Sequence, residues 1–219
     1  MNTHWNNTNR FDSESGTWDK NPGRVKLAGQ IAQSLKEMVP FQKKWNALEI
    51  GCGTGLITCP IAEKVSSITA IDTSEGMIET LKAKMRARQT CAIEALVCDI
   101  LSEPDNEKPR GKFDFIFSSM TLHHISDTSG LLKKINAYLH PGGYLAIADL
   151  DEEDGYFHEN PDEKVHKGFP RDALLAQLKD AGFGDITFST AATITKINRE
   201  ERKMTYTIFL ALARKRKQK

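Results

Sequence analysis

The sequence predicts an α/β fold in which a mostly parallel sheet carries helices on both faces. Apolar runs alternate with turns or helix-like segments along most of the chain, and this alternation is typical of doubly wound sheets. Two further β-rich runs, 184–197 and 204–213, have no helix between them. They must therefore form a hairpin, in which one closing strand is antiparallel. The runs predicted as the earlier strands are 46–50, 67–71, 93–98, 113–118 and 143–149.

Bulk properties indicate a soluble globular protein with one domain over residues 1–219. A chain of 219 residues can bury one core and is short for two domains. The net charge of +1 gives no general attraction to nucleic acid or membrane. No apolar run approaches the roughly 20 residues that span a bilayer, and the polar N-terminus lacks the core of a signal peptide. We therefore expect a cytoplasmic protein.

The N-terminal region is predicted as an irregular polar arm over residues 1–20, followed by a helix. Asn21 is a suitable cap and Pro22 a suitable first residue for that helix. Apolar residues at helical spacing continue until Pro40 ends the segment. They are Val25, Leu27, Ala28, Ile31, Leu35 and Met38.

Helix-like segments near 55–65, 75–88 and 128–139 connect the predicted strands. Residues 150–169 form a polar insertion after the fifth strand. A helix over about 170–181 follows and ends at Gly182.

Two smaller features have simple interpretations. The basic residues 214–219 are predicted as a solvated tail. The cysteines form no C-x-x-C pair and are predicted to be buried reduced thiols. They are Cys52, Cys59, Cys91 and Cys98.

A glycine turn follows the first predicted strand, in the run LEIGCGTG over 48–55. Such a turn lets the backbone bend sharply and approach a ligand without a Cβ in the way. A helix opening behind it presents unpaired N–H groups to the ligand. The second strand ends at Asp72, which lies 72 − 51 = 21 residues beyond Gly51. This offset is close to the roughly 20 residues that place an acid against ribose hydroxyls.

The residue after the turn distinguishes between nucleotide classes. A dinucleotide fingerprint requires a third glycine or alanine where this chain has Leu56. An adenosine ligand without a pyrophosphate therefore fits better, and Leu56 speaks against a nicotinamide-dependent oxidoreductase.

Five segments in order resemble the class I S-adenosylmethionine-dependent methyltransferases. They are LEIGCGTGLIT, AIDTSEGMIETLKAK, CDI, FDFIFSSMTLHHI and LHPGGYLAIADL, between about residues 46 and 150. The resemblance implies a Rossmann-like, seven-stranded sheet with a C-terminal antiparallel strand. It also implies S-adenosylmethionine as the cofactor and S-adenosylhomocysteine as its product.

The resemblance implies a role for each candidate cofactor residue. The turn residues Gly51, Cys52 and Gly53 approach the amino-acid part, with Glu49 nearby. Asp72 holds the ribose hydroxyls, or alternatively caps the next helix. Thr73 to Met77 flank the adenine, and Asp99 bonds its amino group unless it is a simple loop acid. The remaining candidates are Ile100 beside the ring, Trp18 as a cover or a surface-anchored core residue, and Ser118 after the fourth strand.

The acceptor side is predicted from three histidines. The segment 118–125 lacks the Asn/Asp-Pro-Pro-aromatic motif of amino-methyltransferases and resembles the histidine-containing loops of small-molecule methyltransferases. His123 either orients the substrate or accepts its proton, or it packs under the following helix. His158 and His166 are candidate general bases in a lid, the alternative being a solvated acidic loop. We predict no metal, because these residues lack a tight ligand spacing.

The sequence thus predicts a methyltransferase acting on a small-molecule substrate, with no membrane contact. The alternatives are a protein or RNA methyltransferase, or a non-catalytic interaction module with the same fold. The sequence disfavours nucleic acid as a partner, because phosphate contacts need a basic face, whereas the insertion is acidic. The pattern makes no prediction of oligomeric state.

Overall fold

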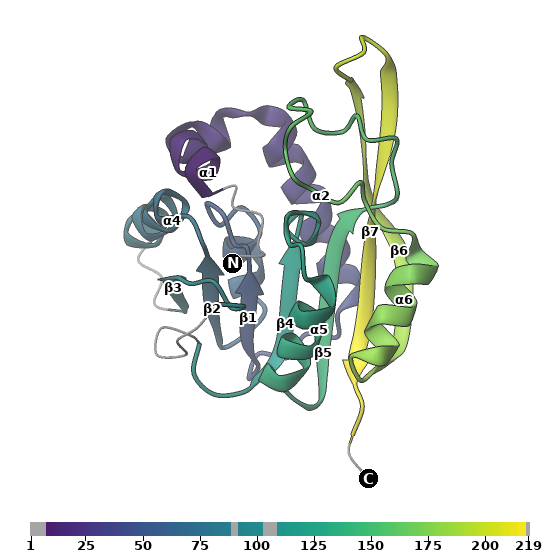
Figure 1. Cartoon of the computed structure of the whole chain (residues 1–219). Helices are drawn as coiled ribbons and strands as arrows, with labels where there is room; N and C mark the ends of the chain where they lie inside the picture. The colour runs from purple at the N-terminus through teal and green to yellow at the C-terminus, as the bar shows by residue number, and fades with distance from the viewer. Residues whose placement is uncertain (1–7, 89–91, 103–108, 218–219) are drawn as a thin grey trace.

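The computed structural model describes residues 8–88, 92–102 and 109–217, and a seven-stranded sheet lies at its centre (Figure 1). The strand order is β3-β2-β1-β4-β5-β7-β6. Strands β1 to β5 are parallel, and β7 is antiparallel to its neighbours β5 and β6. The predicted fold class is confirmed, including the closing hairpin. The strands are β1 (Asn46–Ile50), β2 (Ser67–Asp72), β3 (Ile93–Val97), β4 (Phe113–Ser119), β5 (Leu139–Leu150), β6 (Phe183–Ile197) and β7 (Lys203–Lys215).

Helices cover both faces of the sheet because successive strand residues point to opposite sides. Ala47 and Phe115 pack in one core with α2 (Pro22–Met38), α3 (Thr58–Ala62) and α4 (Glu75–Arg88). Leu48 and Ile116, the next residues along, pack in the other core with α5 (Thr128–Tyr138) and α6 (Arg171–Asp180). Figure 1 shows α5 and α6 together on one side of the sheet. The central strands β1 and β4 are buried on both faces, as parallel strands usually are.

Helix α2 begins as predicted. The Asn21 side chain accepts hydrogen bonds from the backbone N–H groups of Gly23 and Arg24, and Pro22 is the first helical residue. The apolar stripe differs at its start, where Val25 is 41 % exposed. The buried positions of this helix are Ala28, Ile31, Ala32 and Leu35.

The N-terminal region differs from the predicted irregular arm. It forms α1 (Thr8–Glu14) and the 3-10 helix η1 (Ser15–Lys20), and α1 lies beside the start of α4 (Figure 1). Asp12 accepts hydrogen bonds from Ser74 Oγ at 2.6 Å and from the Gly76 N–H at 3.0 Å. These contacts are tertiary, so a local composition pattern does not reveal them. Residues 1–7 lie outside the described part of the chain.

The C-terminal basic residues also differ from the prediction at their start. Arg214 and Lys215 belong to β7 and donate to backbone carbonyls of Gly142 and of Asn136 and Leu139. These two cations therefore satisfy backbone acceptors instead of facing only solvent. Residues 218–219 lie outside the described chain.

Three of the four cysteines, Cys52, Cys59 and Cys98, are buried free thiols, and Cys91 lies outside the described residues. Among the helices that the structure describes, none is both long and apolar enough to cross a membrane.

Candidate active site

The glycine turn connects β1 to α3 at the carboxyl edge of the sheet. All three glycines have positive φ angles, of 73° at Gly51, 53° at Gly53 and 81° at Gly55. A Cβ on Gly51 would lie 2.1 Å from Thr121 Oγ1, whereas a Cβ on Gly53 would meet no atom within 4 Å. Packing therefore requires glycine at position 51. At Gly53 the backbone faces open space, where a ligand can approach it.

A cavity of about 1220 Å³ lies in front of this turn. Its walls come from the loops after β1 to β4, from α1 and η1, from the loop after β5 and from β6. Most candidate cofactor residues line it, which places them in one site. They are Trp18, Glu49, Gly51, Cys52, Gly53, Asp72, Thr73, Met77, Asp99 and Ile100.

Two candidates, Ser118 and His166, do not line the cavity but make hydrogen bonds to segments that do. Ser118 is buried and donates a hydrogen bond from Oγ to the Ile50 carbonyl at 2.9 Å, which links β4 to β1 before the turn. His166 Nε2 lies 3.0 Å from the Ile125 carbonyl, and its backbone N–H donates to the His123 carbonyl at 2.8 Å. The structure thus brings His123 and His158 to the cavity and places His166 in a supporting loop.

The acid at the end of β2 holds the glycine turn. Asp72 Oδ2 accepts a hydrogen bond from the Gly53 N–H at 2.8 Å, and Oδ1 accepts one from the Ser74 N–H at 2.9 Å. Burial raises the pKa of Asp72. The helix cap proper is Ser74, whose Oγ accepts from the Met77 N–H at 3.1 Å. Asp72 therefore ties the turn to β2 and leaves helix capping to Ser74.

Glu49 is a buried acid whose hydrogen bonding is incomplete. Its side chain is almost completely buried, and Oε2 has no hydrogen-bond partner among the described residues. Burial, aided by the nearby Asp72 charge, raises the pKa of Glu49 to about 8. A buried polar atom without a partner is costly. The cavity wall at Glu49 therefore fits a ligand that carries an ammonium group or another hydrogen-bond donor.

The next part of the wall comes from the third strand and the N-terminal segment. Asp99 follows β3, and its Oδ1 accepts from the Leu101 N–H at 2.9 Å. Trp18 of η1 lies under the Arg24 guanidinium, whose Cζ is 3.6 Å from the ring centroid. This stacking holds the indole against α2 at the cavity wall. The acidic and aromatic groups suit the adenine end of a nucleotide.

A histidine–aspartate pair lies further along the cavity. His123, in the 3-10 helix η3 (Leu122–His124), has Nδ1 2.6 Å from Oδ1 of Asp149, the second-last residue of β5. Asp149 Oδ2 also accepts from the His123 backbone N–H at 3.3 Å. Both side chains are buried. A carboxylate only accepts hydrogen bonds, so Nδ1 carries the hydrogen and Nε2 keeps its lone pair.

Asp149 was not predicted as a site residue, because in the sequence it is simply the last residue of the predicted strand 143–149. One signal was available. Asp149 lies at the carboxyl end of the strand beside β4, at the edge where open α/β sheets bind ligands.

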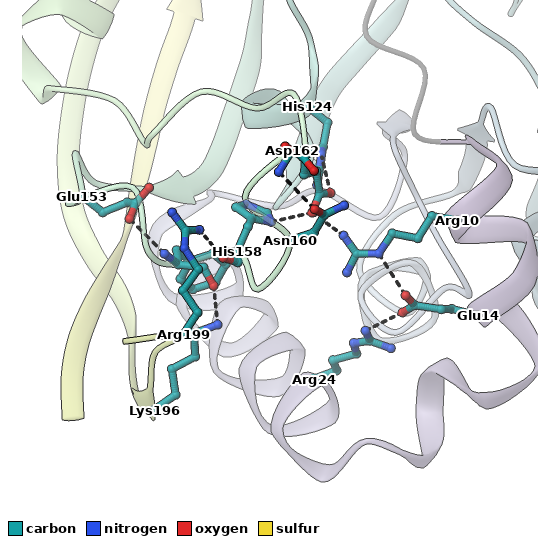
Figure 2. Close-up of polar contacts among 12 residues, drawn as sticks. Arg10, Glu14, Arg24, His124, Glu153, His158, Asn160, Asp162, Lys196 and Arg199 are labelled. Atoms are coloured by element: carbon teal, nitrogen blue, oxygen red, sulfur yellow. Dashed lines mark hydrogen bonds and ion pairs between the residues drawn. The ribbon is translucent and has the colours of Figure 1, made fainter. Parts of the chain in front are cut away.

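A second polar cluster connects the N-terminal segment with the insertion (Figure 2), and four of its residues, Arg10, Glu14, Arg24 and His158, line the cavity. Arg10 of α1 donates from Nη1 to Glu163 Oε2 at 2.5 Å and from Nε to Glu14 Oε1 at 2.9 Å. Arg24 of α2 donates to the other oxygen of Glu14 at 2.6 Å. The cluster therefore links α2, α1 and the insertion through charged hydrogen bonds.

His158 joins this cluster through its imidazole. Its Nδ1 lies 3.3 Å from Glu163 Oε2, and its ring centroid lies 5.1 Å from that of His123. Burial, aided by the nearby His123 and Arg10, lowers the pKa of His158 to about 3. Its Nε2 is buried and has no hydrogen-bond partner among the described residues. The described residues form no group of three or more His, Cys, Asp or Glu side chains suited to a metal ion.

The fold is of the doubly wound α/β class, and the cavity lies at the carboxyl edge of the sheet, where such folds bind ligands. The family model described as a methyltransferase domain matches residues 24–187. The chain belongs to this family, the S-adenosylmethionine-dependent methyltransferases, as the sequence resemblance predicts.

Individual proteins agree with this assignment. An uncharacterized methyltransferase of Schizosaccharomyces pombe is 32% identical over 160 residues, covering 66% of this chain and 56% of the relative. A malonyl-[acyl-carrier protein] O-methyltransferase of Priestia megaterium is 31% identical over 153 residues, covering 68% of this chain and 52% of the relative. The chain thus spans about half the length of these relatives.

A solved structure shows the same fold at low identity. The N-methyltransferase NodS of Bradyrhizobium japonicum, in complex with S-adenosylhomocysteine, superposes with a TM-score of 0.67 at 18% identity. The match covers 95% of this chain and 97% of that one.

Proposed function

We propose that this chain transfers the methyl group of S-adenosylmethionine to a hydroxyl oxygen of a small-molecule acceptor. The observation that carries this proposal is the buried His123–Asp149 pair, whose histidine lines the same cavity as the glycine turn. The pair supplies a base where the acceptor would bind, and a hydroxyl is an acceptor that must lose a proton.

The residues present fit the cofactor. Gly53 leaves open space for its amino-acid part, and Glu49 offers an unpaired oxygen to its ammonium group. Asp72 and Asp99 would hold the ribose and the adenine amino group. When bound, S-adenosylmethionine supplies an electrophilic sulfonium methyl group. The chain's remaining task is to orient the acceptor and exclude water.

His123 would perform the proton transfer. Its Nε2 lone pair accepts the hydroxyl proton, while Asp149 fixes the ring and stabilises the positive charge that forms. The Asp149 carboxylate already holds the imidazole in this tautomer through Nδ1, and it also holds the His123 backbone through its N–H. Little reorganisation is therefore needed when the proton moves.

A second candidate acceptor is a carboxylate. Relatives in Ilyobacter polytropus and Priestia megaterium carry the name malonyl-[acyl-carrier protein] O-methyltransferase. A carboxylate is already an anion and needs no base. In that case the His123–Asp149 pair would serve only to hold η3 against β5.

The two candidates predict different responses to Asp149→Asn. Methyl transfer to a small-metabolite extract, with radiolabelled methyl donor, gives the acceptor, and purified acceptor gives kcat and KM. For a hydroxyl acceptor, Asp149→Asn and His123→Gln should each lower kcat by about a hundredfold or more. His140→Ala, an exposed histidine in β5, is the matched control.

Affinity for S-adenosylhomocysteine should stay unchanged in all three variants. A kcat within a few-fold of wild type in both site variants would favour the carboxylate acceptor and contradict the proposal.

A further inference from the structure

We infer that His158, oriented by Glu163, is a second recognition point for the acceptor, which therefore carries a second hydroxyl on the carbon next to the methylated oxygen. This inference rests on the proposed function, because it extends the acceptor side of the same cavity. It assigns to the insertion loop a role in substrate selection and leaves proton transfer to His123.

The first support is the setting of Glu163. Its side chain is only 3 % exposed, which requires partners for its charge. Arg10 supplies a charged hydrogen bond to Oε2, and Glu14 and Arg24 continue the chain of charges towards α2 (Figure 2). The carboxylate is thus held through Oε2 by a residue of α1. It can in turn fix the imidazole of His158.

The second support is the tautomer that follows. Nδ1 of His158 lies 3.3 Å from a carboxylate oxygen, which can only accept, and this contact favours the tautomer with hydrogen on Nδ1. Nε2 then has a lone pair, is buried and lacks a partner among the described residues. His158 also lines the cavity. A hydroxyl of a bound acceptor would satisfy this nitrogen.

His158 and His123 differ in the charges that surround them. Burial, together with the nearby His123, Arg10 and Lys196, lowers the pKa of His158 to about 3, although Asp149 acts in the opposite direction. The ring is therefore neutral at physiological pH and too weak a base to take a hydroxyl proton. It can only accept a hydrogen bond. His123 has its own buried carboxylate to stabilise a proton, and His158 faces a carboxylate already shared with Arg10.

The spacing gives the chemical class. The His123 and His158 ring centroids are 5.1 Å apart with planes inclined at 47°. Two imidazoles this close can accept from two hydroxyls on neighbouring carbons of one molecule. Phe157 stands edge-on to His158, with centroids 5.2 Å apart, and offers an apolar surface to the carbon skeleton. An aromatic or cyclic diol suits this arrangement.

The tautomer can be measured without knowing the natural acceptor. Long-range proton–nitrogen NMR spectra should show His158 with hydrogen on Nδ1, and no titration between about pH 5 and pH 8. Glu163→Gln should produce a mixture of tautomers, because an amide can donate as well as accept. Asp162→Asn removes the adjacent exposed carboxylate and should change nothing. A wild-type spectrum with hydrogen on Nε2 would overturn the inference.

Binding of model acceptors tests the recognition itself. Catechol and phenol, titrated into the protein saturated with S-adenosylhomocysteine, differ only by the second hydroxyl. Catechol should bind about tenfold more tightly than phenol. His158→Phe should abolish the difference, and His158→Gln, which keeps an acceptor oxygen, should retain most of it.

A failure of this inference can be told apart from a failure of the proposed function. Equal affinity of the wild-type protein for catechol and phenol, or no binding of either, overturns the second recognition point. A wild-type protein that does not bind S-adenosylhomocysteine fails the proposed function instead. Circular dichroism and S-adenosylhomocysteine affinity of each variant confirm that the fold is intact.

Discussion

Among single residues, Glu49 gives the clearest dependence of stability on pH. Its pKa is raised by burial from 4.5 to about 8, so between these values the folded protein holds a proton that the unfolded chain releases. The free energy of unfolding therefore falls as pH rises through this window. At about 1.4 kcal/mol per pH unit, the loss at pH 7 is on the order of 3 kcal/mol.

Glu49→Gln should remove this dependence. We expect the variant to be more stable than wild type at pH 7.5 and to lose that advantage as pH falls towards 4.5, in urea unfolding of the cofactor-free protein. Glu94→Gln, an exposed change on β3, is the control and should leave the slope unaltered. A Glu49→Gln effect of the same size at every pH would contradict the assignment.

Asp72 should be the residue most sensitive to loss of charge in cofactor binding. It already accepts backbone hydrogen bonds from Gly53 and Ser74, so it is held in place before a ligand arrives. Asp72→Asn should weaken S-adenosylhomocysteine binding by about tenfold or more, because hydrogen bonds to a charged acceptor contribute about 1.5–3 kcal/mol. Isothermal titration measures this. Asp180→Asn, at the exposed end of α6, should bind as wild type does.

Local pattern predicts some site residues and not others. Gly51 and Asp72 lie at spacings set by one strand–turn–helix–strand unit, so a single stretch of sequence reveals both. Arg10 and Glu163 are 153 positions apart and meet only in the folded chain. Each is an ordinary charged residue in its own neighbourhood, and no periodicity connects them.

Among the elements, α2 shows how a capping residue stabilises the start of a helix. The Asn21 side chain satisfies two of the backbone N–H groups that the first turn leaves unpaired. Asn21→Ala should therefore lower the free energy of unfolding by about 1 kcal/mol, and Asn21→Ser by much less. Urea unfolding measures this change. An unchanged slope of the free energy of unfolding against urea concentration would show that the substitution alters stability alone. Equal losses in both variants would mean that the side chain acts through something other than capping.

The helices before α2 were not predictable in this way. Residues 8–20 lack an apolar stripe, and none of the residues in α1 or η1 is buried. They are ordered by polar contacts to the cofactor loops, such as Asp12 to Ser74 and Asp19 to Thr54. By contrast, the β6–β7 hairpin was evident, because two long β-rich runs with no helix between them leave few other arrangements.

For the whole molecule, the cavity joins segments that are far apart in sequence. Its walls include the loops of the parallel strands, the N-terminal segment and the loop after β5, and Arg10–Glu163 bridges the last two across the opening. The opposite end of the sheet, where Lys215 holds the carbonyl of Leu139, is not part of the cavity. Ligand binding should therefore stabilise the segments around the cavity more than the rest of the fold.

We expect S-adenosylhomocysteine to slow amide hydrogen exchange in residues 8–20, 51–55, 72–77 and 151–166 together, and not in α6. At a ligand concentration about a hundredfold above Kd, binding adds about 2.7 kcal/mol to the free energy of each opening reaction that must release the ligand. Arg10→Gln breaks the bridge and should remove the protection of 151–166 while preserving that of 51–55. Arg202→Gln, whose side chain is 72% exposed, serves as the control. Protection of 151–166 that survives Arg10→Gln would show that the insertion closes independently of the N-terminal segment.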